Sequence, residues 1–458
     1  MPVPFSLYAI GAGLALVLSF VVVGLFAGVP SMARASTTAV SPANRAPWHG
    51  TQHNGASSIA LALLLLSIAT GLFGTQNAFT NINMTLFWIA FVLGVPYAVA
   101  VVGDFYAGAN PWRFLVDLLE RASVLQFRPR WQLPNAWGYG PALTLYIAFI
   151  WLELFGHLQP RGLSLALLAY TAINVAGAWL LGKEAWFRNG EFFGVFLRLI
   201  GRMSPHRSAS EGATGEAGGA SRWRWPFLGL LEERVEQPAL VVFILFMLSS
   251  TAFDGLHDTL PFASIFWKGI YPQIAPWFSP APGQQYALSA KLYYVWQWCS
   301  LVVSPIVYLA IVTTCVAVAR RITHAPQSVT ELVLRFSPSL VPIALVYHVT
   351  HYYTLLLAQG GQLLKLVSDP FGWGWNLFGT ARLTIDPFMI DAQAIWHTQV
   401  GLILFGHIVS VYLAHVEALR CFGKARTAAL SQVPILVLMV LLTTLGLWIL
   451  SLPLSTGA

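Results

Sequence analysis

The chain has 458 residues, of which 57% are hydrophobic and only 9% are charged, and its mean hydropathy is +0.66. This composition excludes an ordinary soluble globular protein, and many separate apolar segments predict an all-α, polytopic integral membrane protein. The formal net charge of +7 comes from basic loops on one side of the membrane. We therefore predict the lipid bilayer as a partner and no binding to nucleic acid.

Ten apolar segments are predicted to cross the membrane as helices. Most are close to the roughly 20 residues that a helix needs to span a hydrocarbon core of about 30 Å. A helix also satisfies its own backbone hydrogen bonds there. The segments are residues 5–27, 58–75, 85–103, 139–156, 163–182, 237–253, 293–318, 337–358, 397–416 and 433–451.

Basic residues predict the orientation of these segments. If the N-terminus lies outside, the cytoplasmic loops contain 20 Lys and Arg residues and the outer loops contain 5. This asymmetry follows the positive-inside rule and places both termini outside. The first segment could also be a signal peptide cleaved near Ala33-Arg34-Ala35. We predict an uncleaved helix instead, because a basic region before the segment is missing and ordinary signal-peptide insertion would invert every later loop.

A short motif follows the third segment. Asn110 is predicted to cap an interfacial helix over residues 111–121, with Pro111 at its first position. One Asn-Pro-x turn also resembles a water-channel signature, but that fold needs two such turns. We therefore favour the helix cap.

The chain is predicted to have two membrane halves, residues 1–202 and 225–458. The linker 203–224 between them is rich in Gly, Ala and Ser, which predicts a flexible cytoplasmic segment. The three cysteines form no CxxC motif and predict no disulfide framework.

The two longest outer loops, 254–292 and 359–396, are rich in aromatic residues, including Trp267, Trp277, Trp373 and Trp375. Such rings are typical of an aromatic belt at the membrane surface. They would equally suit an apolar aromatic substrate. For the second role we predict Trp373, Trp375 and Tyr352 as substrate-binding residues.

Ionisable side chains lie inside or at the ends of several apolar segments. Such groups are costly at membrane depth and usually mark a pathway or a site. In the predicted orientation they fall between the middle of the membrane and its outer surface. They are Glu153, Asp254, His257, Asp258, His348, His351 and His407.

The spacing of these residues favours a metal site. His348 and His351 are three residues apart and share a helix face, and His407 is expected at a similar depth on the next segment. Two histidines on one helix with a third ligand from elsewhere are typical of metal binding. Imidazole and carboxylate ligands suit zinc, manganese, cobalt or iron. The predicted ligands are His348, His351, His407 and His257.

Asp254 and Glu153 are the predicted catalytic carboxylates, which would orient a ligand or accept a proton. Simpler explanations stay open. A single intramembrane histidine most often hydrogen-bonds a neighbouring helix, and two histidines on facing helices also suit haem. Glu153 is able to pair with His157, and Asp254, His257 and Asp258 would suit the solvated end of a helix.

Five stretches resemble a family of bacterial integral membrane proteins that is labelled fenitrothion hydrolase. They are VVGDFYAGANPWR (101–113), MLSSTAFDGLHDTLP (247–261), VYHVTHYYTLL (346–356), SDPFGWGWNLFGTA (368–381) and WHTQVGLILFGHIVSVYLAHVEALR (396–420). The resemblance extends from about residue 45 to residue 450. It implies a location in the bacterial inner membrane and the hydrolysis of an organophosphorus triester to a nitrophenol and a dialkyl thiophosphate. It supplies no catalytic residues.

The resulting hypothesis is a membrane hydrolase that takes an apolar small-molecule substrate from the bilayer and attacks it with metal-bound hydroxide. One alternative is a transporter or channel for a small solute. Another is a haem- or copper-binding redox subunit or an assembly factor for one. The sequence leaves a second membrane subunit or a homo-oligomer open.

Overall fold

The computed structural model describes residues 5–26, 55–132, 138–206, 223–232, 235–278, 285–383 and 391–451. Their secondary structure is helical, and in this part of the chain the β pairing consists of one isolated bridge between His206 and Trp223. This confirms the all-α fold. Residues 207–222 of the predicted linker lie outside the described residues.

The chain divides into two compact units. Unit 1 comprises Met1–Gly28, Val241–His351 and Ala392–Ala458, and unit 2 comprises Val29–Leu240 and Tyr352–Asp391. Each unit therefore combines segments that are far apart in the sequence.

Eight helical segments among the described residues are long and apolar enough to cross a membrane. They are Gly55–Phe73, Ile82–Val102, Pro160–Leu181, Pro238–His257, Tyr286–Thr323, Val329–Gln359, Gln393–Phe422 and Ala425–Ile449. The other two predicted segments are also helices, the 22-residue α1 (Phe5–Phe26) and the 16-residue α8 (Gly140–Phe155). At 1.5 Å per residue α8 is only about 24 Å long. The chain is thus a multi-pass helical membrane protein.

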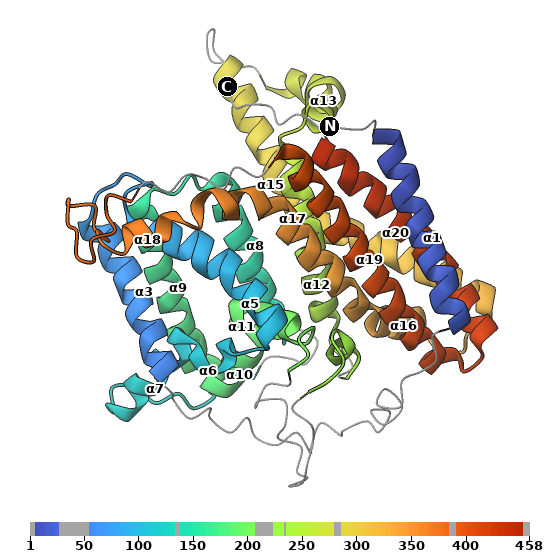
Figure 1. The fold of residues 1–458 in the computed structure, drawn as a ribbon, viewed down its shortest axis with the longest axis horizontal. Coiled ribbons are helices and arrows are strands. Elements are labelled where there is room, and N and C mark those ends of the chain that lie inside the picture. Colours follow the sequence, from blue (N-terminus) through green and yellow to red (C-terminus); the bar gives the residue numbers. More distant parts are fainter. Residues whose placement is uncertain are drawn as a thin grey trace. The chain divides into compact units, whose positions relative to one another are not determined.

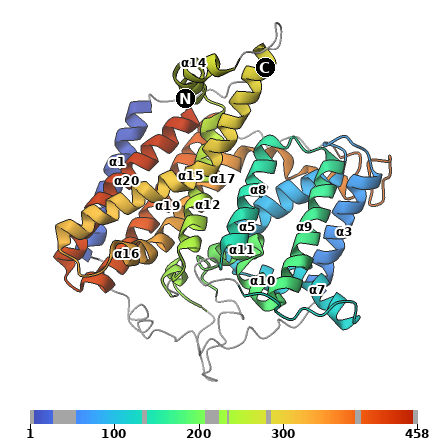
Figure 2. The ribbon, with the colours of Figure 1, turned by 180° about the vertical axis from the view of Figure 1, so that it is seen from behind.

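Unit 1 is a bundle of long helices (Figure 1). Its helices are α1 (Phe5–Phe26), α12 (Pro238–His257), α13 (Leu260–Ser264), η5 (Ile265–Ile270), α14 (Tyr271–Ile274), η6 (Ala275–Trp277), α15 (Gln285–Thr323), α16 (Val329–Phe336), η7 (Ser337–Leu340), α17 (Val341–Gln359), α19 (Ala392–Phe422) and α20 (Ala425–Ser451). α1, α19 and α20 contact one another, and α15 packs on α20. The view from behind shows α12 and α15 in the same bundle (Figure 2).

Tyr347 fixes α17 within this bundle. Its ring packs in a buried cluster with Ala12 of α1, Ile403 of α19 and Leu447 of α20. Gly446 permits this approach, because a Cβ at that position would collide with the Tyr347 hydroxyl. The packing sets the rotation of α17 and therefore the direction of its two histidines.

Unit 2 contains shorter helices around an aromatic core. They are α3 (Gly55–Phe73), α4 (Ile82–Met84), the π-helix η2 (Thr85–Gly94), α5 (Val95–Val102), α6 (Tyr106–Ala109), α7 (Pro111–Arg121), α8 (Gly140–Phe155), α9 (Pro160–Leu181), α10 (Lys183–Asn189), α11 (Phe192–Gly201), η4 (Leu228–Leu231) and α18 (Gln362–Leu366). Trp112 stacks on Phe193 with ring centroids 5.9 Å apart, and Tyr146 stacks on Phe192 at 5.5 Å.

Asn110 and Glu191 connect the helices of unit 2. The Asn110 side chain accepts a hydrogen bond from the Arg113 N–H, which confirms the predicted cap of α7. Its amide nitrogen donates to the fully buried Glu191 carboxylate at 3.0 Å, and the Tyr170 hydroxyl of α9 donates to the same group at 2.6 Å. Glu191 also caps α11. Burial raises the pKa of this carboxyl, and these hydrogen bonds lower it in part.

We expect Glu191→Ala to lower the free energy of unfolding by about 3 kcal/mol or more, because it leaves several buried donors without an acceptor. Glu331→Ala removes the half-exposed partner of Arg335 and should cost less than about 1 kcal/mol. Thermal unfolding of both variants in the same detergent measures the difference. Equal losses would show that Glu191 is no more important than a surface carboxylate.

Candidate active site

His351 and Asp254 form a carboxylate–imidazole pair in unit 1. His351 lies on α17 and Asp254 lies in the last turn of α12, and His351 Nε2 is 2.7 Å from Asp254 Oδ2. Their side chains are 23% and 16% exposed. Because a carboxylate only accepts hydrogen bonds, the imidazole donates Nε2–H to it, and the neutral tautomer that this contact favours carries its lone pair on Nδ1. Asp254 therefore selects the tautomer of His351.

Gly255 sets the distance between α12 and its neighbours at this site. A Cβ on Gly255 would lie 3.9 Å from both Cε1 and Nδ1 of His351, and 2.7 Å from Cγ2 of Ile449 on α20. Glycine is thus required for α20 to approach the residue next to Asp254. The sequence motif Asp254-Gly255 places a carboxylate and a close helix contact side by side.

His348 lies one turn before His351 on α17. It interacts electrostatically with both His351 and Asp254. The three-residue spacing correctly predicted that the two histidines share a helix face. Asp254 and His351 are thus in direct contact, and His348 lies one helical turn away on the same face of α17.

His257 turns toward its own helix end. Its Nδ1 is 2.8 Å from the Asp254 carbonyl oxygen, and its Nε2 is 3.4 Å from Asp258 Oδ1. The ring stacks on Phe253 at a centroid distance of 5.4 Å. These contacts are those expected of a residue at the end of a helix, the simpler explanation given above, rather than of a metal ligand shared with His348 and His351.

His407 is fully buried on α19. Its Nδ1–H donates to the Ile403 carbonyl oxygen one turn earlier, at 2.8 Å. Within the described residues its Nε2 has no hydrogen-bond partner. His407 therefore keeps an imidazole lone pair inside the bundle.

The metal site expected from His348, His351, His407 and His257 stays a prediction. Across the described residues, no group of three or more His, Cys, Asp or Glu side chains is arranged to hold a metal ion. The contacts of His351 are with Asp254, whereas His257 and His407 each contact a carbonyl oxygen of their own helix.

Glu153 and Tyr352 form a second polar pair, in unit 2. The Tyr352 hydroxyl donates to Glu153 Oε1 of α8 at 2.8 Å. Tyr97 of α5 interacts electrostatically with the same carboxylate. Glu153 therefore has the Tyr352 hydroxyl as a partner, and the exposed His157 follows α8 with a positive φ of 42°.

Trp373 and Trp375 lie on an ordered turn of unit 2 after α18. The Asp369 carboxylate accepts hydrogen bonds from the N–H groups of Trp373 and Gly374 at 2.9 and 2.7 Å. The two indole rings meet edge to face at 5.1 Å and both are exposed. An aromatic belt and a substrate contact both remain consistent with this arrangement.

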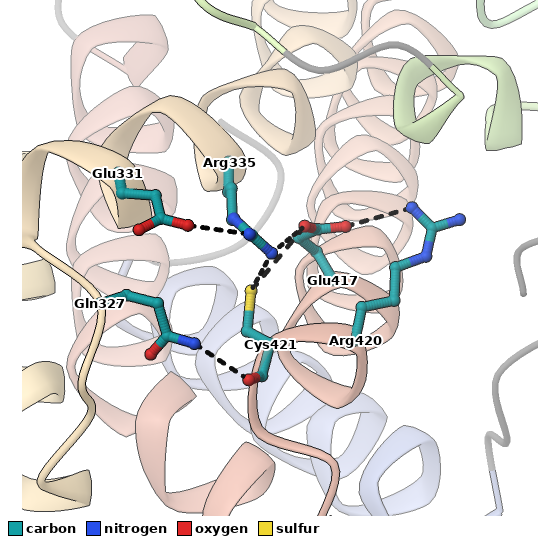
Figure 3. Close-up of polar contacts among 6 residues, drawn as sticks. All are labelled: Gln327, Glu331, Arg335, Glu417, Arg420 and Cys421. Atoms are coloured by element: carbon teal, nitrogen blue, oxygen red, sulfur yellow. Dashed lines mark hydrogen bonds and ion pairs between the residues drawn. The ribbon is translucent and has the colours of Figure 1, made fainter. Parts of the chain in front are cut away.

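A polar cluster at the other end of the unit 1 bundle was not predicted from the sequence (Figure 3). Buried Glu417 of α19 contacts Arg420 at 3.1 Å and Arg335 of α16 at 3.9 Å. Arg335 also contacts the Cys421 thiol at 3.4 Å and Glu331 at 2.8 Å. From the sequence, His415 and Glu417 are expected only to lie at the level of the lipid headgroups near the inner surface.

Comparisons with known proteins give no relatives. No protein-family model, no curated protein and no solved structure matches the chain. Any functional conclusion therefore depends on the residues themselves and on the resemblance seen in the sequence.

The Asp254–His351 pair is suited to proton transfer. A carboxylate that holds one ring nitrogen orients the imidazole and stabilises the imidazolium that forms when the other nitrogen accepts a proton. Pairs of this kind activate water or hydroxyl nucleophiles in many unrelated proteins. The candidate active site is thus the Asp254–His351 pair, with His348 one helical turn away on α17.

We expect Gly255→Ala to destabilise the protein by about 1–3 kcal/mol, because its methyl group overpacks the contact with Ile449. Adding Ile449→Ala should recover part of this loss by removing the colliding group. Unfolding temperatures of the single and double variants in detergent measure the effect. A Gly255→Ala protein as stable as the wild type would contradict the close packing described here.

Proposed function

We propose that this chain is a membrane hydrolase of apolar organophosphorus triesters, with His351 as general base and Asp254 as its positioning residue. The observation that carries the proposal is the 2.7 Å contact between His351 Nε2 and Asp254 Oδ2 inside the helix bundle. The resemblance to the fenitrothion hydrolase family supplies the substrate class.

The reaction follows from the tautomer of His351. Water next to Nδ1 attacks phosphorus in line, and its proton passes to Nδ1 as the new P–O bond forms. The P–O bond to the aryl group breaks, and the nitrophenolate leaves with the electron pair. Asp254 stabilises the resulting imidazolium, which then releases its proton. A nitrophenolate is a stable anion, so the leaving group needs little help from an acid.

The apolar surroundings suit this substrate class. Neutral aryl phosphotriesters partition into lipid, and a site inside a membrane bundle would meet them there. A water-poor environment also strengthens the interaction between the imidazolium and the carboxylate. The steps above are assigned to His351 and Asp254 only, because these two side chains are in direct contact.

Replacing His351 by Gln should lower the rate of nitrophenol release about 10²–10⁴-fold, the usual effect of losing a general base. Asp254→Asn should also slow the reaction, because it no longer selects the tautomer with a basic Nδ1. His407→Gln provides the matched control and should stay near the wild-type rate. The assay uses membranes with equal amounts of each protein and an apolar nitrophenyl phosphotriester.

Three outcomes would contradict this mechanism. A His351→Gln protein with the wild-type rate would exclude the general base. Loss of turnover in His407→Gln together with loss on chelation would restore the metal-hydroxide mechanism. Uptake of a solute into vesicles without nitrophenol release would favour a transporter.

We also propose that ten helices cross a bacterial inner membrane with both termini outside. The support is the ratio of 20 to 5 basic residues between the two sets of loops. In this orientation the Asp254 end of unit 1 is the outer end, and the end with Arg335 and Arg420 faces the cytoplasm.

Reporter fusions test this topology. A fluorescent protein inserted at Ser210 should fluoresce, because the loop 183–236 is cytoplasmic, and a phosphatase that is active only outside should be active when fused after Ala458. Each reporter is exchanged at both positions as a control. Finding both positions on the same side would contradict the ten-span topology.

A further inference from the structure

α19 carries a series of buried polar side chains along most of its length. They are Gln399, His407, Ser410, His415 and Glu417. From Gln399 to Glu417 the helix rises about 27 Å, close to the thickness of a hydrocarbon core. Burying so many polar groups in a membrane helix requires partners or a function.

Most of these side chains have partners on other helices of unit 1. Gln399 donates to the Thr350 carbonyl of α17 at 2.8 Å. Ser410 donates to the Ser339 carbonyl of η7. His415 contacts Gln432 of α20 at 2.8 Å. Such hydrogen bonds hold membrane helices together and explain these residues without further function.

The two histidines differ, because each has one ring nitrogen without a partner. His407 and His415 are 0% and 1% exposed, and within the described residues the Nε2 atom of each makes no hydrogen bond. Buried polar atoms of this kind are rare in native proteins and commonly bind water.

The hydrogen bonds that do exist define both tautomers. His407 Nδ1 faces a carbonyl oxygen, so Nδ1 carries the hydrogen and Nε2 is an acceptor. His415 Nδ1 faces the amide nitrogen of Gln432, which also donates to the Ala428 carbonyl. His415 Nδ1 is therefore the acceptor, and its Nε2–H is a donor.

The unsatisfied atoms are thus an acceptor in the middle of the bundle and a donor nearer one end. Eight residues separate them, a rise of about 12 Å, which is more than one water molecule spans. A short chain of waters would accept from His415 Nε2–H and donate to His407 Nε2. The Ser410 hydroxyl lies between the two histidines in sequence and offers a further acceptor.

The cluster of Arg335, Glu417 and Arg420 lies just beyond His415 (Figure 3). We call this the basic end of unit 1, because exposed Arg320, Lys424 and Arg426 are also located there. Gln327, which precedes α16, donates a hydrogen bond to the Cys421 carbonyl of α19 at 3.2 Å and so connects the two elements at the basic end. The exposed charged side chains show that this end of the bundle lies at the protein surface.

We propose that α19 holds a water-lined proton path that leads from the basic end of unit 1, past His415, to His407. A proton arriving through this path binds to Nε2 of His407 and converts the ring to an imidazolium. Nδ1–H stays on the Ile403 carbonyl, which does not take up the proton. The path therefore ends at His407, and the bundle gains a proton-binding site without leaking protons across the membrane.

The packing of the residues next to His407 on α19 is consistent with a proton path that ends at His407. The buried cluster that includes Ile403 also contains Ala12, Tyr347 and Leu447, and Val346 packs against Gly406. Among these residues the titratable group is the Tyr347 hydroxyl. This proposal does not depend on the proposed hydrolysis, because it concerns proton access alone.

Exchange of the imidazole Cε1 hydrogen for deuterium tests the path. The exchange requires both protonation of the ring and water at the ring, and mass spectrometry reads it for each histidine. The protein in lipid nanodiscs is incubated in D₂O at neutral pH. We expect His407 and His415 to exchange within about tenfold of His397, an exposed histidine on the same helix.

Rates at least about 100-fold slower at both histidines would show a dry interior and overturn the proposal. Exchange at His415 alone would overturn the extension to His407. As a second measurement, His415→Leu should slow exchange at His407 while leaving His397 unchanged. If His407 still exchanges at the wild-type rate in that variant, protons reach it by another route and the proposed path is wrong.

Discussion

The contact between Asp254 and His351 is the interaction on which this account depends. A carboxylate inside an apolar bundle is unfavourable unless another group compensates its charge or donates hydrogen bonds to it. His351 supplies that partner from the neighbouring helix, and Gly255 and Tyr347 set the helix packing that brings the two together. The same contact favours one tautomer of His351, and in the proposed function this is the tautomer that acts as general base.

The sequence predicted the fold class and most helix positions, because apolar segments of sufficient length behave alike in any membrane. The segment 163–182 differs by only a few residues from Pro160–Leu181. The cap at Asn110 was also predictable, since capping is local. The 39-residue length of α15 could not be predicted, because its first turns extend beyond the apolar segment. The π-helical turns of Thr85–Gly94 could not be predicted either, because they do not change the pattern of apolar residues.

The candidate site was predicted in part. The spacing of His348 and His351 placed them on one helix face, and Asp254 was recognised as an unusual carboxylate near a membrane segment. Which partner each residue would find was not predictable, because depth along a helix says nothing about its rotation. Within the described residues, the Nε2 atom of His407 accordingly makes no hydrogen bond. The contact of Glu417 with Arg335 joins two helices that are far apart in the sequence.

A double-mutant cycle on turnover tests the central claim most directly, namely that Asp254 acts through His351. Nitrophenol release is measured for the wild type, His351→Gln, Asp254→Asn and the double variant, each at equal amounts in membranes. If the two residues act as one unit, the double variant is no slower than His351→Gln alone, because Asp254 has nothing left to orient. Losses that multiply in the double variant would contradict the account and give Asp254 an independent role.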